Sequence, residues 1–244
     1  MGSIPITRST SLSGRGAARL SAPTRTATLP ARFIADVREP DFERECAALY
    51  SATLPYHNFQ HVQTVLRSAE RLLADCANEG IPVDVRVVYY AVLLHDAGYH
   101  EAHQALGYDT KEAYSAALAR RLLAAREIDT DTIAAVEQAI MATLRDAHCV
   151  AAEDAVVRMA DLAGIGADFA EFLRNTVSIR AELALMTGAV APWSEWCRRT
   201  REVLEGYLAG DIRLTREFDR AQPDNFFARG EANLARLLVE PEPL

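Results

Sequence analysis

The stretch Val87-Val88-Tyr89-Tyr90-Ala91-Val92-Leu93-Leu94-His95-Asp96-Ala97-Gly98-Tyr99 decides the fold, because its first eight residues are apolar or aromatic on every face. A segment of this kind is either a strand or a helix that is buried all round. The segments on both sides have a helical period, and no alternating strand pattern of any length occurs. We therefore predict an all-α fold with this stretch as its central helix.

The predicted central helix ends in His95-Asp96. An imidazole and a carboxylate at the buried end of an apolar helix are costly to remove from water unless a partner compensates them. A divalent metal ion is one such partner, since a neutral imidazole nitrogen and a carboxylate oxygen suit zinc, manganese or iron. A hydrogen bond between His95 and Asp96 at the helix terminus is the alternative interpretation of the dipeptide alone.

The composition is that of one globular domain without a membrane segment. The chain has 244 residues, of which 50% are hydrophobic, and this is ample apolar material for a core. No run reaches the roughly 18 consecutive apolar residues of a transmembrane helix. The net charge of -8 argues against bulk binding of nucleic acid or of an anionic membrane, which requires a basic surface. The four cysteines form no Cys-x-x-Cys pair, which is typical of reduced thiols in a cytosol-like compartment.

Residues 1–32 differ in composition from the rest of the chain. They are rich in Ser, Thr, Gly and Pro and hold five arginines but no acidic residue. Without them the chain carries 21 basic and 34 acidic residues, a net charge of -13. A segment with no apolar period does not bury enough surface to pack, so we predict a disordered extension over 1–32 and a single helical domain over 33–244. We expect a cytoplasmic protein, with an organelle transit peptide at 1–32 as the alternative.

The remainder of the chain is predicted to be a series of helices. Short polar residues before an apolar period, and acidic residues in the first turn, mark the helix starts. Asn58 is a candidate N-cap, as is either Asp109 or Thr110. The predicted helices span residues 40–51, 62–78, 84–96, 110–127, 129–144, 153–162, 167–187, 192–209 and 224–238.

Five ionisable side chains lie in or beside apolar runs of these helices. His57 and His61 are four residues apart and share one face of a helix. His95 and Asp96 end the central helix, and Asp161 lies in a later apolar run. If the helices pack around the central one, these groups meet in a mixed nitrogen and oxygen site with open positions for water. Such a site suits activation of a water nucleophile and polarisation of a phosphoryl oxygen.

Three motifs follow in order along the chain, Tyr-His-Asn-x-x-His-Val at 56–62, Leu-His-Asp-Ala-Gly-Tyr at 94–99 and Ala-Asp-Leu at 160–162. In this order they resemble the HD-domain superfamily of metal-dependent phosphohydrolases, and the first also resembles the motif of the cyclic nucleotide phosphodiesterases. The match is closest to a bacterial group of predicted HD phosphohydrolases, which share an acid-Ser-Ala helix, here at 112–116, and an Ala-Arg-x-Asn-Leu-type helix, here at 228–236. The resemblance covers about residues 40–238 and implies an HD-like helical bundle.

The resemblance implies a role for each of the five ionisable residues. His61, His95, Asp96 and Asp161 would be the ligands of one metal ion. His57 would donate a proton to the leaving-group oxygen, a step suited to a histidine that titrates close to neutral pH near a metal. The alternative for His57 is to orient His61. Asp96 could also bridge to a second ion or orient the nucleophilic water, so it is a candidate catalytic residue together with His57.

The expected number of metal ions rests on the remaining histidines. HD proteins with a full two-metal site usually supply further histidines between the His-Asp pair and the last Asp, and here only His100, His103 and His148 stand in that interval. We therefore expect one tightly held divalent ion (Zn, Mn, Ni, Fe or Mg) and at most a second, weakly bound one with Glu112 beside it. Asn58 is expected to fix the first motif as an N-cap.

Substrate contacts are predicted for Lys111, Arg145 and Tyr99. Lys111 begins a helix near the second motif and could meet a phosphate, as could Arg145 or Arg158; the alternative for each is a solvated side chain. Tyr99 could stack on a base or a sugar, although aromatic residues near a buried helix are more often core. The chain has no phosphate-binding glycine loop and no Gly-x-Ser-x-Gly elbow, so kinase-like and serine-hydrolase functions have no support.

We therefore expect a metal-dependent phosphohydrolase that cleaves a phosphate mono- or diester of a small molecule, with a nucleotide as the first candidate. The alternatives are a non-catalytic HD module that binds metal and nucleotide and, after it, an iron-dependent oxygenase. The expected partner is a small phosphorylated substrate, without nucleic acid or membrane, and a homodimer is left open.

Overall fold

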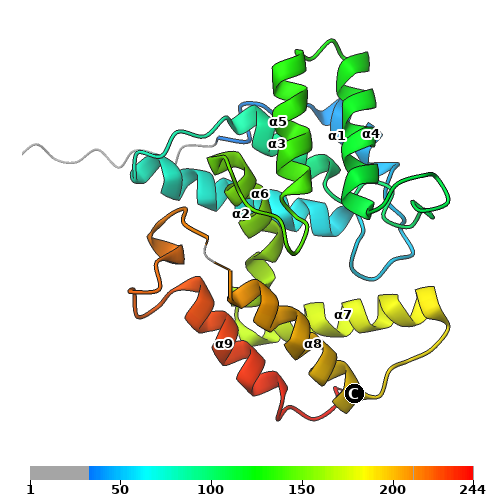
Figure 1. Ribbon diagram of the computed structural model, residues 1–244, viewed down its shortest axis with the longest axis vertical. Coiled ribbons are helices and arrows are strands. Elements are labelled where there is room, and N and C mark those ends of the chain that lie inside the picture. The colour runs from blue at the N-terminus through cyan, green and yellow to red at the C-terminus, as the bar shows by residue number, and fades with distance from the viewer. Residues whose placement is uncertain (1–32, 211, 244) are drawn as a thin grey trace, which may run out of the picture. The chain divides into compact units, whose positions relative to one another are not determined.

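The computed structural model describes residues 33–210 and 212–243. Within these ranges every regular element is a helix, so the predicted all-α fold is confirmed (Figure 1). The helices are α1 (Pro40–Ala47), α2 (Phe59–Asn78), α3 (Val85–Leu94), α4 (Lys111–Ala125), α5 (Thr130–Met141), α6 (Ala152–Asp161), α7 (Phe169–Thr187), α8 (Trp193–Leu208) and α9 (Phe226–Leu237), with short 3-10 helices η1 (Leu162–Gly166) and η2 (Arg216–Phe218). No described helix has both the length and the apolar character needed to cross a lipid bilayer. The extension predicted over 1–32 lies outside the described residues.

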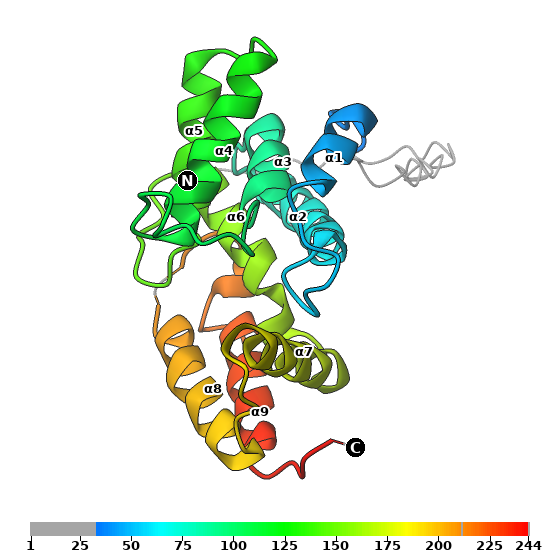
Figure 2. The same cartoon turned by 90° about the vertical axis from the view of Figure 1, so that its right-hand side faces the viewer.

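Helix α3 is the centre of the packing. Its residues from Val87 to Leu94 are buried, and none is more than 3% exposed. Helices α1, α2, α4, α5 and α6 all contact α3 and cluster around it in Figures 1 and 2. Two tyrosines tolerate burial in this helix because each hydroxyl has a partner: Tyr89 donates to Glu43 and Tyr90 donates to Glu39. The prediction of a central buried helix is therefore confirmed.

Several helix boundaries differ from the prediction, among them the end of α1 at Ala47 rather than at 51, and two of the differences have a local reason. Helix α2 begins at Phe59, earlier than predicted, because the side chain of Asn58 accepts the N–H groups of the first turn. Helix α5 ends at Met141 rather than at 144, because the Arg158 guanidinium binds the carbonyl oxygens of the residues that follow. These oxygens belong to Ala142, Leu144, Arg145 and Ala147.

Helices α7, α8 and α9 form a second group on one side of α6 (Figures 1 and 2). They share a smaller buried cluster made of Phe172, Cys197, Leu234 and Leu237. Helix α9 also holds η1, since Arg229 Nε donates to Gly166 O at 3.0 Å and Asn233 Nδ2 donates to Ile165 O at 2.9 Å. The last helix of the chain therefore fixes the backbone that directly follows Asp161.

Candidate metal centre

The structure brings four predicted ligands together from three helices. His61 lies in the first turn of α2, His95 and Asp96 directly follow α3, and Asp161 is the last residue of α6. One nitrogen or oxygen atom of each side chain lies within 4.8 Å of those of the other three. His61 Nε2 is 3.0 Å from Asp161 Oδ1, and His95 Nε2 is 3.1 Å from Asp96 Oδ2. These residues form a cluster that could hold a metal ion.

The turn after α3 holds His95 in place. Tyr50 Oη donates to Leu93 O at 2.9 Å and so binds a carbonyl at the end of the helix. Gly98 then reverses the chain with a backbone φ of 71°, a conformation that residues other than glycine rarely adopt. A Cβ atom at Gly98 would also lie 2.5 Å from Tyr114 Cε1. The glycine of the second motif is therefore needed for the backbone that presents the His-Asp pair.

His95 has the surroundings of a metal ligand. Its ring is fully buried, and Nδ1 donates to Val92 O at 2.9 Å because a carbonyl can only accept. That bond leaves Nε2 as an acceptor. Nε2 faces two further acceptors, Asp96 Oδ2 at 3.1 Å and Asp161 Oδ1 at 3.5 Å. It has no hydrogen-bond partner among the described residues. Acceptors that face one another in a buried position require a cation or a proton between them. The donor set therefore fits a divalent ion with nitrogen and oxygen ligands.

The charges of the cluster stabilise one another against the cost of burial. Burial opposes the ionisation of Asp96, but Lys111 and His95 hold the pKa of its carboxyl well below the ordinary value. Burial also opposes the protonation of His95, but the Asp96 charge and a contact with Asp161 outweigh it and raise the pKa of the imidazole to about 10. In the absence of a metal ion, a proton on His95 therefore supplies the positive charge.

Lys111 brings a further positive charge to the cluster. It is the first residue of α4, and its Nζ atom lies 2.7 Å from Asp96 Oδ1 and 3.0 Å from Glu112 Oε1. The two carboxylates that were expected to hold a second, weak metal ion therefore share an ammonium group. Lys111 is the only lysine in the chain.

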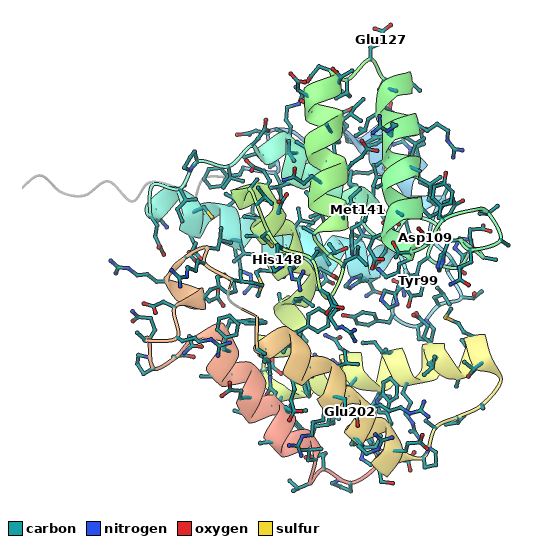
Figure 3. The ribbon with its side chains drawn as sticks, viewed as in Figure 1. Tyr99, Asp109, Glu127, Met141, His148 and Glu202 are labelled. Carbon is teal, nitrogen blue, oxygen red and sulfur yellow. The ribbon has the colours of Figure 1, made fainter. Side chains whose placement is uncertain are left out.

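His57 pairs with Glu182 on α7, a residue that no sequence motif marks. His57 Nδ1 bonds to Glu182 Oε1, and the other carboxylate oxygen accepts the backbone N–H groups of Tyr56 at 3.0 Å and His57 at 2.8 Å. Burial opposes the ionisation of Glu182, but its bonds to His57 lower the pKa of the carboxyl. Tyr99 belongs to the loop after α3 and lies on the side of that loop that faces α7 in Figure 3. Its ring stacks on the His57 ring with centroids 3.8 Å apart. The imidazole is therefore held in one orientation, with Nε2 directed away from the carboxylate.

A cavity of about 340 Å³ borders the cluster. Its charged lining near the cluster consists of His57, Asp96, Lys111, Glu112 and Asp161. A second cavity of about 750 Å³, lined mainly by α2, η1 and α7, borders His61 and Asp161. Asp161 is the most exposed of the four predicted ligands, with 23% of its side chain exposed. A small molecule in either cavity can therefore reach the same carboxylate.

Several other predicted residues lie away from the cluster. Arg145 is 55% exposed and pairs with the neighbouring Asp146 at 3.1 Å, and it does not line the cavity that borders the cluster. Arg158 is used by the backbone after α5. The three further histidines do not join the cluster, and His148 lies on the loop between α5 and α6 in Figure 3. The structure thus places Lys111 and Tyr99, but not Arg145, beside the site.

Comparison with known proteins finds a similar fold among solved structures. No protein-family model matches the sequence, and no curated protein matches it. Among solved structures, the phosphodiesterase domain of the Salpingoeca rosetta rhodopsin phosphodiesterase is similar, with a TM-score of 0.59 and 15% sequence identity over 81% of this chain and 78% of that chain. At this level of identity the similarity concerns the fold. The chain therefore has a helical fold similar to that of a phosphodiesterase domain.

Proposed function

We propose that this chain is a metal-dependent phosphohydrolase of the HD-domain superfamily, with His61, His95, Asp96 and Asp161 as the ligands of one divalent ion. The observation that carries the proposal is the buried Nε2 atom of His95, which faces two carboxylate oxygens and has no hydrogen-bond partner in the described part of the chain. The similarity of the fold to a phosphodiesterase domain supports the same function.

A bound divalent ion would lower the pKa of a water molecule and polarise a phosphoryl oxygen. The chain's own residues prepare the site for it. Lys111 holds Oδ1 of Asp96, which leaves Oδ2 directed at the rings of His61 and His95. Asp161 borders both cavities, so its carboxylate can accept a hydrogen bond from the attacking water and orient it.

His57 is the proton donor in this proposal. Glu182 binds Nδ1 and fixes the orientation of the ring, so the proton for transfer is carried on Nε2. The water oxygen bonds to phosphorus, the bond between phosphorus and the alcohol oxygen breaks, and the alcohol oxygen takes the proton from Nε2. A proton released by the water restores His57, so each cleaved ester bond consumes one water. His57 borders the same cavity as Asp96 and Asp161, as this transfer requires.

Lys111 favours a single metal ion over a pair, because its ammonium group binds the oxygens of Asp96 and Glu112. A di-iron oxygenase would need those oxygens for its second iron. The substrate is a phosphate mono- or diester of a small molecule, and the resemblance of the first motif to the cyclic nucleotide phosphodiesterases makes a nucleotide the first candidate.

The full-length chain, loaded with Mn²⁺, would be assayed against p-nitrophenyl phosphate and bis(p-nitrophenyl) phosphate. We expect hydrolysis of at least one ester, its loss in Asp161→Asn, and an unchanged rate in Asp146→Asn, an exposed acid of the same type. His57→Ala should reduce the rate by about 100-fold or more while the metal content stays constant. Full activity in Asp161→Asn would contradict the proposal. Binding of metal and nucleotide without any hydrolysis would support the non-catalytic module instead.

A further inference from the structure

The cavity of about 340 Å³ that borders the cluster extends along one face of α7 and one face of α8. Its lining includes Phe172, Thr176 and Ile179 from α7 and Trp196, Thr200 and Val203 from α8. Spacings of three and four residues place each set on a single face of its helix. Small-molecule pockets occupy about 300–1,000 Å³, so the cavity is large enough for a small organic group.

Two buried polar atoms in this lining lack partners. Trp196 is 7% exposed, and neither its Nε1 atom nor Oγ1 of Thr200 has a hydrogen-bond partner among the residues that the structure describes. One turn earlier, Trp193 Nε1 donates to Glu240 O at 2.9 Å. Buried polar atoms are normally paired, and an indole N–H can only donate. Trp196 and Thr200 therefore suit a ligand that carries a hydrogen-bond acceptor.

Two threonine hydroxyl groups of the lining already have partners within the protein. Thr143 Oγ1 donates to Ile140 O at 2.8 Å, and Thr176 Oγ1 donates to Phe172 O at 2.9 Å. Apart from the charged residues of the cluster, the other polar side chains of the lining are Tyr56, Asn175, Arg199 and Tyr207. The side chains of Leu162, Ile165, Phe172, Ile179, Val203 and Leu204 make much of the remaining wall apolar. A ribose or another polyol would place several of its hydroxyl groups against these apolar side chains, where they find no partner.

The charged and the apolar parts of the lining belong to one cavity, and His57 is part of the charged side. We propose, resting on the phosphohydrolase function above but replacing its nucleotide candidate, that the substrate is the phosphate ester of an apolar alcohol that carries one acceptor atom. The leaving alcohol occupies the space between Phe172, Ile179 and Val203, and its acceptor receives hydrogen bonds from Trp196 Nε1 and Thr200 Oγ1. The phosphate lies at the cluster, so that His57 protonates the alcohol oxygen.

A series of linear alkyl phosphates tests the apolar part of the proposal. Ethyl, butyl and hexyl phosphate have leaving alcohols of nearly equal acidity, so differences in kcat/KM report binding of the chain. Each methylene buried in the transition state should raise kcat/KM by about fourfold. We expect hexyl phosphate to exceed ethyl phosphate by up to about 200-fold and to exceed uridine 5′-phosphate and glycerol phosphate. The hexyl-to-ethyl ratio should collapse in Val203→Asp and persist in Val190→Asp, an exposed valine of the loop between α7 and α8.

Tryptophan fluorescence tests the polar part without catalysis. The chain has two tryptophans, so Trp193→Phe leaves Trp196 as the only emitter. Cyclohexanone, which is apolar and carries one acceptor, should shift the Trp196 emission, whereas cyclohexane should not. Thr200→Val in the same background should weaken cyclohexanone binding by about fivefold, the effect of one ordinary hydrogen bond.

The outcomes separate this inference from the proposed function. A hexyl-to-ethyl ratio near unity, or a preference for uridine 5′-phosphate over hexyl phosphate, would overturn the apolar substrate class while hydrolysis itself stands. If no ester is hydrolysed, the phosphohydrolase function fails, and the fluorescence titration still decides the cavity. A Trp196 emission that does not respond to cyclohexanone would overturn the assigned acceptor site.

Discussion

Replacing Lys111 with methionine tests whether its ammonium group stands in for a second metal ion. The Nζ atom is 2.7 Å from Asp96 Oδ1 and 3.0 Å from Glu112 Oε1, and these carboxylate side chains are only 2% and 8% exposed. Methionine keeps much of the side-chain volume and removes the charge. In Lys111→Met the two buried carboxylates therefore lose their common partner.

The magnitude follows from the burial of the three side chains. Breaking a fully buried ion pair costs about 3–5 kcal/mol. Because the Lys111 side chain is 30% exposed, water offsets part of that cost, and we expect a loss of about 1–3 kcal/mol in the metal-free protein. In a chain of this size the loss lowers the melting temperature by roughly 2–12 °C. A divalent ion that binds the freed carboxylates, present at a concentration of 100 times its Kd, would restore about 2.7 kcal/mol of folding stability.

The free energy of unfolding would be measured by urea denaturation in EDTA and again with Mn²⁺, and the metal content by plasma mass spectrometry. We expect Lys111→Met to be destabilised in EDTA, to recover stability with Mn²⁺ and to bind one ion more than the wild type. Lys111→Arg keeps the charge and should bind no additional ion. If Lys111→Met is as stable as the wild type in EDTA and gains no ion, the reasoning is refuted.

Three further predictions follow from the site. Glu182→Gln should lower kcat by about 100- to 10,000-fold with unchanged metal content, because a neutral amide binds the His57 ring less strongly than the carboxylate does. Glu171→Gln on the same helix is the control, and equal losses in both variants would contradict the pairing. In the folded protein the pKa of His95 is raised from 6.5 to about 10. Protonation of His95 therefore contributes its full stability to the metal-free protein at pH values below 6.5, and this contribution is lost as the pH rises toward 10. A metal ion competes with this proton, so calorimetry should show proton release on metal uptake and an affinity that increases with pH; an affinity independent of pH would contradict the ligand role. Gly98→Ala should lower stability in urea denaturation by about 1–3 kcal/mol, because φ is 71° and a tyrosine ring lies 2.5 Å from the added Cβ; unchanged stability would show that the turn relaxes.

The centre of the fold and the four clustered residues were predictable because their signals are local. A run of eight apolar residues must be buried, and α3 is buried over that run. The order of the three motifs marked His61, His95, Asp96 and Asp161, and helix packing around α3 brings them together. The helix needed only periodicity, the ligand set needed the resemblance of the three motifs to a known family, and neither needed knowledge of how the later helices pack.

The partners of long or distant side chains were not predictable from local pattern. His57 and Glu182 are 125 residues apart, and the only signal for Glu182 is a lone acid within the apolar run 181–186. That Lys111 meets a phosphate stays a prediction, and the carboxylates of the protein that it contacts were not foreseen. Arg158 was another candidate for phosphate, and its guanidinium instead binds backbone carbonyls. The direction of such flexible side chains depends on tertiary packing, which a single sequence does not contain.

The most direct test of the account is the metal content of the full-length chain, purified without added metal and measured by plasma mass spectrometry. We predict close to one equivalent of a divalent transition metal per chain. The metal should be lost in Asp161→Asn and retained in Asp146→Asn. A wild-type chain that contains no metal and takes up none on titration would contradict the account, because a proton on His95 would then be the only cation between the two carboxylates.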